Sequence, residues 1–278
     1  MTGLGIYVQI PFCASKCSFC NFSSRVSPES VFADYCGAVV AEVRNLPEIL
    51  RASGIRDDLL SAPVDTIYLG GGTPPIVGME RLRAIIAEIR KCVRAESLAE
   101  FTVEVTPGSV DERALWELLD MGVNRLSVGA QTFDDQELRS VGRLHTSRDT
   151  LVLVADARRA GFKNISLDLI AGLPFQTPAT WQQSLDAVAA LRPEHISVYV
   201  FEIDEKSRLG REVLRHGTRF HSESVPNEEF MADAYEIALR FLRASGYRQY
   251  EISNFALPGY GSIHNRKYWD LEPYVGLG

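Results

Sequence analysis

Residues 10–22 read IPFCASKCSFCNF, and this segment holds three of the five cysteines in the spacing C-x3-C-x2-C: Cys13, Cys17 and Cys20. The segment follows a short apolar run, residues 6–10, which predicts a β-strand. Three thiolates on one short loop can bind three irons of a 4Fe-4S cluster, whereas four cysteines would saturate it. The spacing therefore predicts a cluster with one iron open to a substrate or cofactor.

A zinc site is the alternative interpretation of the same three cysteines. Structural zinc usually has four closed ligands, often from two paired knuckles. The other two cysteines, Cys36 and Cys92, each stand alone inside a helical pattern and are expected to be small buried hydrophobic residues. An odd number of cysteines, three of them close together, favours a metal site over a disulfide framework.

The composition is that of a soluble globular protein, with 46% hydrophobic and 23% charged residues in a chain of 278. A net charge of -7 and the absence of a basic run argue against a nucleic-acid partner. The sequence contains no run of 18 apolar residues, so it predicts no transmembrane helix, and the N-terminus lacks the pattern of a signal peptide. We therefore expect a cytoplasmic protein. This expectation is compatible with transient association with a membrane surface.

Strand and helix patterns alternate regularly from residue 6 to residue 200. Apolar runs predict strands at 6–10, 65–69, 101–105, 124–128, 164–170 and 195–200, with helices at 30–46, 81–93, 111–121, 148–160 and 179–191 between them. This alternation predicts a parallel sheet with helices outside it. Six units rather than eight indicate an α/β fold of the open, partial (β/α)6 TIM-like barrel type.

The pattern changes after residue 200. Residues 202–221 are charged and predict irregular structure, residues 227–245 predict a helix, and residues 247–254 predict an edge strand. Residues 264–278 predict a loop. We therefore divide the chain into a core, 1–205, and an extension of helix and loop, 206–278.

Polar and glycine residues gather where the predicted strands end: Gly71, Gly72, Thr73, Glu104, Gln131, Arg143 and Asp168. The glycine run at 70–72 matches neither a Walker loop nor G-x-G-x-x-G, and alone it predicts only a tight turn. A carboxylate such as Asp168 inside a barrel strand is costly unless it is paired or hydrated. Each residue alone fits an ion pair or a cap as well as a ligand. Their recurrence on successive strands favours one shared site that faces the cysteine loop.

The histidines give a weaker signal. His264 lies among aromatic residues in HNRKYW, where it fits either a haem ligand or a packed loop residue. His195 opens a predicted strand and is expected to be a structural hydrogen-bonding residue. His216 and His221 lie in the charged segment and are expected to be exposed.

Several motifs together resemble the radical S-adenosylmethionine (SAM) superfamily and, within it, the HemN-like group. They are YVQIPFC at 7–13, GGGTP at 70–74, GAQTF at 129–133, DLIAGLP at 168–174 and YEISN at 250–254. The group contains oxygen-independent coproporphyrinogen III oxidases, HemW haem chaperones and a class of radical methyltransferases. The resemblance implies that Cys13, Cys17 and Cys20 bind a 4Fe-4S cluster and that SAM is the second cofactor.

The resemblance also implies a set of SAM-binding residues: Tyr7, Phe19, Gly71, Gly72, Thr73, Glu104, Gln131, Arg143 and Asp168. In the oxidase, the position of Glu104 serves the SAM on the cluster. The positions of Gln131, Arg143 and Asp168 serve a second SAM there.

Two features favour the haem chaperones over the oxidases. The oxidases usually carry a fourth cysteine two positions after the third, where this chain has Phe22, and they carry a longer arm before the first strand. The block around His264 is similar to a HemW motif that is implicated in haem binding. The resemblance thus implies a haem chaperone that delivers haem to respiratory haem proteins and uses SAM either for turnover or for regulation. The oxidase and the methyltransferase remain the alternatives. HemW proteins continue into a C-terminal domain, so we expect this chain to be truncated before it.

Overall fold

The computed structural model describes residues 3–54, 59–60, 62–95 and 98–278, which contain one nine-stranded sheet. Its six central strands are parallel and lie in chain order: β1 (Leu4–Gln9), β2 (Val64–Gly70), β3 (Glu100–Val105), β4 (Arg125–Gln131), β5 (Ile165–Ala171) and β6 (His195–Val200). The sheet has two separate edges, β7 and β9, and does not close. The open, partial (β/α)6 barrel predicted from the sequence is confirmed.

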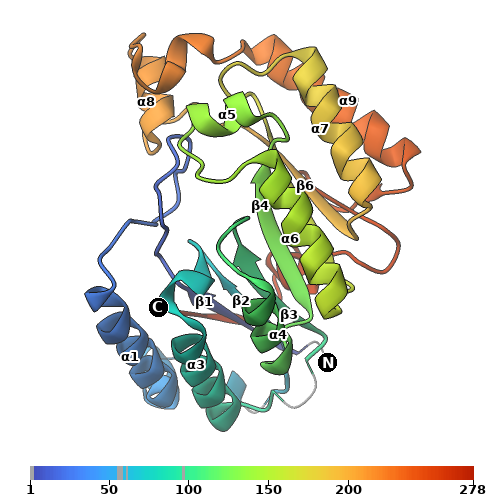
Figure 1. The fold of residues 1–278 in the computed structure, drawn as a ribbon. Helices are drawn as coiled ribbons and strands as arrows, with labels where there is room; N and C mark the ends of the chain where they lie inside the picture. Colours follow the sequence, from blue (N-terminus) through green and yellow to red (C-terminus); the bar gives the residue numbers. More distant parts are fainter. Residues whose placement is uncertain (1–2, 55–58, 61, 96–97) are drawn as a thin grey trace.

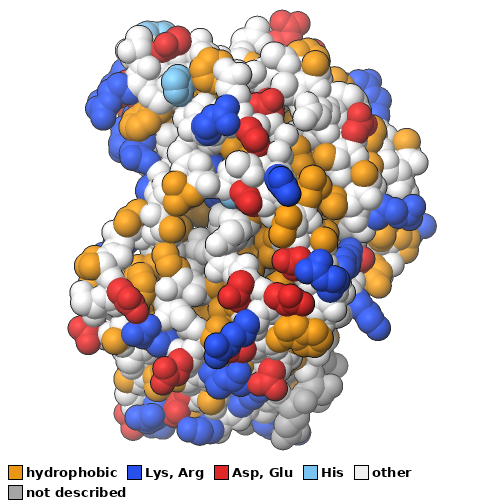
Figure 2. All heavy atoms as spheres, in the orientation of Figure 1, with side chains coloured by type: hydrophobic (Ala, Val, Ile, Leu, Met, Phe, Trp, Pro, Cys, Tyr) orange, Lys and Arg blue, Asp and Glu red, His pale blue; other side chains and the backbone are white. Residues whose placement is uncertain are grey.

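Helices connect the parallel strands and cover the outer face of the sheet (Figure 1). They are α1 (Ser30–Arg44), α2 (Leu46–Ala52), α3 (Met79–Cys92), α4 (Glu112–Asp120), α5 (Asp135–Ser140), α6 (Ser147–Ala160) and α7 (Pro178–Leu191), with a 3-10 turn, η2 (Pro74–Val77), after β2. Among the described residues, no helix is both long enough and apolar enough to cross a membrane. The face drawn in Figure 2 carries acidic and basic side chains next to one another.

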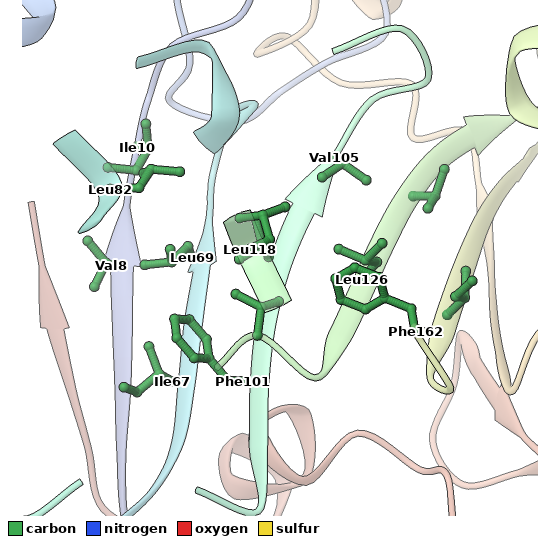
Figure 3. Packing of buried hydrophobic residues seen from close by; sticks show 14 of the residues in the cluster. Val8, Ile10, Ile67, Leu69, Leu82, Phe101, Val105, Leu118, Leu126 and Phe162 are labelled. Carbon is green, nitrogen blue, oxygen red and sulfur yellow. The ribbon is translucent and has the colours of Figure 1, made fainter. Parts of the chain in front are cut away.

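The hydrophobic core lies between the sheet and these helices. Strand side chains alternate between two faces, so Val8, Leu69 and Phe101 point to the same side from three neighbouring strands (Figure 3). Leu82 of α3 and Leu118 of α4 are fully buried in the same cluster. Burial of such side chains contributes about 1.5–3 kcal/mol each and holds the helices on the outer face.

The opposite, concave face of the sheet is polar. The same alternation that turns Phe101 and Val103 outward turns Glu104 inward, and neighbouring strands place Tyr68, Arg125 and Asp168 on this face. A strand that is apolar on one side and polar on the other is expected when only one side packs against helices. The polar face is therefore the surface on which a ligand can be bound.

The segment after β6 contains more regular structure than its sequence predicts. Residues 202–221 were expected to be irregular, but they contain α8 (Arg208–Leu214) and the start of η3 (Arg219–Ser224). The predicted helix at 227–245 is confirmed as α9 (Glu228–Ala244). The expected edge strand forms two short pieces, β7 (Arg248–Gln249) and β8 (Asn254–Ala256), of which β8 pairs antiparallel with β6.

The loop predicted over 264–278 is wrong. This segment begins inside α10 (Ile263–Trp269) and continues to β9 (Tyr274–Leu277), which pairs parallel with β1. The helix depends on a distant partner: the carboxylate of Glu100 accepts hydrogen bonds from the amide of Ile263 at 2.7 Å and the hydroxyl of Ser262 at 2.9 Å. A carboxylate at a helix N-terminus satisfies amides that the helix itself leaves unpaired.

Candidate functional site

The cysteine loop leaves the end of β1 and is held on the end of β2. The amide of Ile10 donates to the carbonyl of Gly70 at 2.8 Å, and the amide of Thr73 donates to the carbonyl of Phe12 at 2.8 Å. The amide of Cys13 donates to the carbonyl of Arg25 at 3.0 Å. These bonds fix the backbone on both sides of the loop at the carboxyl edge of the sheet, where ligands bind in parallel folds.

The glycines at 70–72 are required by this contact. A Cβ at Gly72 would lie 2.5 Å from the carbonyl oxygen of Phe12 and 2.6 Å from that of Ile10. Gly71 has a φ of 92°, a left-handed conformation that L side chains rarely adopt. The glycine run therefore lets the turn after β2 lie directly against the backbone of the cysteine loop.

The three cysteines of the loop are free thiols and lie near one another. Burial is the main cause of the raised pKa of the Cys13 thiol, and its proximity to Cys20 and Cys17 adds to the increase. In the described part of the chain, no three His, Cys, Asp or Glu side chains are placed to hold one metal ion. A cubane cluster has a different requirement, because each cysteine binds a different iron. Three unpaired thiols on one anchored loop supply the donor set that such a cluster needs.

Cys36 and Cys92 lie apart from this loop, in the core around α1 and α3. Cys36 is buried, as the sequence predicts. Cys92 is only half-buried and packs against the edge of the same core.

Two of the predicted SAM residues, Gly71 and Glu104, form a hydrogen-bonded group with Tyr68. The carboxylate of Glu104 accepts from the Tyr68 hydroxyl at 2.9 Å and from the amide of Gly71 at 2.9 Å. Burial raises the pKa of Glu104 to about 7, and the charge of Asp168 adds to this increase. The Thr73 hydroxyl is buried and lies 3.3 Å from that of Thr106. This group can accept hydrogen bonds from the hydroxyl or amino groups of a ligand.

Asp168 lies on the same face among hydroxyl groups. It accepts from the hydroxyls of Ser127 at 3.3 Å and Ser166 at 3.4 Å. Burial raises its pKa, whereas the nearby guanidinium of Arg125 lowers it. Arg125 is only 3% exposed, so its permanent positive charge is buried near the carboxylates of Glu104 and Asp168.

Three other predicted residues lie in different surroundings. Arg143 lies against the cysteine loop, with Nη1 3.5 Å from the sulfur of Cys17. Gln131 ends β4 with a φ of 70° and lies close to Gly129, which precedes it on the strand. Phe19 packs on the edge of a small apolar cluster between the loop and α8.

Tyr7 lies on the concave face beneath the cysteine loop and stacks on Tyr68 with ring centroids 5.8 Å apart. Burial raises its pKa, and the charge of Glu104 adds to the effect. His264 lies next to this pair, 5.4 Å from the ring of Tyr68.

His264 is 1% exposed and has partners on both ring nitrogens. Nδ1 lies 2.9 Å from the hydroxyl of Thr66, and Nε2 lies 2.9 Å from that of Tyr268. Burial lowers its pKa to about 4. In this arrangement neither nitrogen is available to a haem iron.

Three other histidines, His195, His216 and His221, follow their sequence-based expectations. His195 begins β6 and bonds on both sides, 2.8 Å from the hydroxyl of Ser166 and 2.8 Å from that of Tyr250. His216 and His221 are exposed.

Several residues near the site were not predicted from the sequence: Lys16, Tyr68, Glu100 and Arg125. The alternation of β2, β3 and β4 was enough to find the last three, because each lies on the inward side of its strand. Lys16 had no such signal, since its contact depends on the turn of the loop.

Comparison with known proteins supports this description. The model of the Radical SAM superfamily matches residues 7–188, a span from β1 into α7. The fold and the three-cysteine loop thus define a radical SAM protein. The haem chaperone HemW of Bacillus subtilis is 37% identical over 98% of this chain and 68% of its own length. HemW of Lactococcus lactis is 34% identical over 98% of this chain and 67% of its own length.

A solved structure agrees. The radical SAM enzyme coproporphyrinogen III oxidase (HemN) from Escherichia coli superposes with a TM-score of 0.83 at 25% identity, over 99% of this chain and 63% of that one. The chain belongs to the radical SAM superfamily and, within it, to the HemW family. Membership implies a 4Fe-4S cluster and SAM as cofactors.

Proposed function

We propose that this chain is the radical SAM part of a haem chaperone, which binds haem and delivers it to respiratory haem proteins in the cytoplasm. The observation that supports this most directly is the 37% identity with the haem chaperone HemW over 98% of the chain. The chain spans about two thirds of that relative, so the proposal concerns its core, 1–205, together with the extension, 206–278.

In this proposal Cys13, Cys17 and Cys20 would hold three irons of the cluster and leave the fourth open to SAM. When bound and reduced, the cluster would supply the electron for the cleavage of SAM. The chain's own residues orient SAM. The turn at Gly71, Gly72 and Thr73 lies against the cysteine loop, and Glu104 lies beside it with lone pairs left for ribose or ammonium donors.

For the remaining SAM residues we propose the roles that the family resemblance implies: Tyr7 and Phe19 flank the cluster and the first SAM, and Gln131, Arg143 and Asp168 serve a second SAM. The polar surroundings of Asp168 support a ligand role, because the hydroxyls of Ser197, Ser127 and Ser166 and the guanidinium of Arg125 all stabilise its charged form. Equilibrium dialysis with SAM tests this assignment: two molecules bound per chain are expected, and one per chain would contradict the second site.

His264 is proposed to contribute to haem binding, and the structure defines what this requires. Haem ligation through Nε2 has to replace the hydrogen bond to Tyr268 and expose a buried ring. Haem is titrated into reconstituted protein and into His264→Ala while the Soret band is followed. We expect saturable binding by the wild-type protein and an altered band in the variant. An identical band in the variant would remove His264 from the haem site.

The oxidase is the second candidate, because HemN shares this fold at a TM-score of 0.83. An anaerobic assay with coproporphyrinogen III, SAM and a reductant separates the two. A chaperone leaves the substrate unchanged, and formation of protoporphyrinogen IX would refute the chaperone proposal. The exposed Phe22 occupies the position at which the oxidases carry a fourth cysteine, which favours the chaperone.

A further inference from the structure

Two positive charges contact the predicted cluster ligands: Lys16, which has no role in the SAM or haem assignments, and Arg143, whose proposed role in a second SAM site does not explain its contact with a cysteine sulfur. Nζ of Lys16 lies 3.5 Å from the sulfur of Cys20. Nη1 of Arg143 lies 3.5 Å from the sulfur of Cys17. Both distances are within hydrogen-bonding range for a sulfur acceptor, so two of the three ligand sulfurs each have a cationic donor.

The ammonium of Lys16 is held in place by all of its donors. Besides Cys20, it donates to the carbonyl of Phe22 at 2.7 Å and to the hydroxyl of Ser24 at 3.0 Å. An ammonium has three N–H groups, and this arrangement uses each of them once. The side chain thus ties the segment that follows Cys20 back onto the cluster loop.

The backbone beneath Lys16 is also fixed, in this case by α8. The guanidinium of Arg208 donates to the carbonyl of Lys16, and the amide of Leu209 donates to the carbonyl of Ser18 at 2.8 Å. The amide of Ser18 in turn donates to the carbonyl of Val141 at 3.0 Å. Because the loop is held from two directions, the position of the ammonium follows from the fold rather than from a free side chain.

Arg143 is fixed in a similar way. Its guanidinium donates to the carbonyl of Gly129 as well as to Cys17, and its amide donates to the carbonyl of Leu138 at 3.0 Å. A Cβ at Gly129 would lie 3.2 Å from Nη2 of Arg143, so the absence of a side chain there leaves room for the guanidinium.

We propose that Lys16 and Arg143 are positioning residues that set the reduction potential of the 4Fe-4S cluster through hydrogen bonds to its ligand sulfurs. One electron from a low-potential donor converts the cluster from the 2+ to the 1+ state, and no bond forms or breaks. The reduced form carries one more negative charge, so adjacent cations stabilise it more than the oxidised form. Hydrogen bonds to the sulfurs and local charge are known determinants of cluster potentials.

This inference depends on the three cysteines as cluster ligands and not on haem handling. The test is a redox titration of the anaerobically reconstituted protein with dithionite, without SAM, in which the EPR signal of the reduced cluster is followed. For Lys16→Gln we expect the ratio of reduced to oxidised cluster at a fixed potential to fall about tenfold, which equals about 59 mV for one electron. Lys16→Arg keeps the charge and restores most of the ratio.

Arg25→Gln is the matched control for charge, because Arg25 follows the cysteine loop, is exposed and, within the described part of the chain, shows no side-chain hydrogen bond to a cysteine. A potential that is unchanged in Lys16→Gln, or lowered equally in Arg25→Gln, would overturn the proposal. If Lys16→Gln binds no cluster, Arg143→Gln provides the same measurement with the Lys16 contacts intact. In that case a potential equal to wild type overturns the proposal, and a lowered one supports it. Haem binding by these variants is measured separately, so failure of the haem proposal leaves this result interpretable.

Discussion

The buried imidazole of His264 makes the protein less stable in mild acid, and His264→Gln tests this directly. The pKa of His264 is about 4 in the folded chain because burial disfavours the charged ring. In the unfolded chain it returns to about 6.5. Below about pH 6.5 the unfolded state therefore takes up a proton that the native state does not, and the free energy of unfolding decreases until about pH 4.

The size of this effect follows from the two pKa values. Proton linkage gives a loss of about 1 kcal/mol between about pH 7.5 and about pH 5.8 from this one group. Glutamine does not titrate, so the loss is absent in His264→Gln. The variant pays a separate, pH-independent cost. Replacing two well-formed hydrogen bonds, to Thr66 and Tyr268, removes about 2 kcal/mol at either pH.

The assay is equilibrium urea unfolding of both proteins, without cluster, at the two pH values. His145 also has a pKa lowered to about 4 by burial, but it is present in both proteins and cancels in the comparison. We expect the wild-type protein to lose about 1 kcal/mol more than the variant on acidification. Equal losses in the two proteins would show that His264 is not a buried, neutral histidine, and its availability to haem iron would have to be reconsidered.

Three further substitutions test other parts of the structure. Gly72→Ala brings a methyl group within 2.6 Å of two backbone carbonyl oxygens, so the iron content after reconstitution should fall at least about tenfold. The control Gly37→Ala places its methyl group in open space and should retain the iron content of the wild-type protein. Lys267→Met removes a buried ammonium from the partly exposed carboxylates of Asp65 and Glu272 and should lower the free energy of unfolding by about 2 kcal/mol. The control Lys91→Met replaces an exposed lysine, and its free energy of unfolding should stay within about 0.5 kcal/mol of wild type. Burial raises the pKa of Glu104 to about 7, so its carboxylate forms only as the pH rises through that value. SAM affinity, measured by calorimetry, should therefore increase across neutral pH in the wild-type protein and stay constant in Glu104→Gln.

The parallel core was predictable because each of its units is specified locally. Residues 101–105 alternate apolar and polar, and α4 after them is capped at its N-terminus by Asp111, whose side chain accepts from the amide of Ala114 at 2.8 Å. Both signals lie within a few residues of the element that they specify. The end of the chain depends more on distant partners. α10 has a local N-cap, Ser262, whose hydroxyl accepts from the amide of Asn265 at 3.2 Å, but the amide of Ile263 is satisfied by Glu100 on β3. β9 pairs with the edge of β1. A window of local sequence contains neither Glu100 nor β1.

The residues of the site also divide into those that local sequence specifies and those that distant contacts specify. For this reason the cofactor was easier to predict than the residues proposed to control its reduction potential. The cysteines were predictable because the spacing of this short motif carries its function, and the glycine run was predictable as a tight turn. The inward position of Arg125 follows from Leu126 and Val128 facing the core, so strand phase alone could have identified it. The contact of Lys16 with Cys20 could not be found in this way. It requires that α8, almost two hundred residues later, hold the backbone of the loop through Arg208. If the cations next to the sulfurs set the cluster potential, then the identity of the cofactor is a local property of this sequence, whereas its potential is a property of the whole fold.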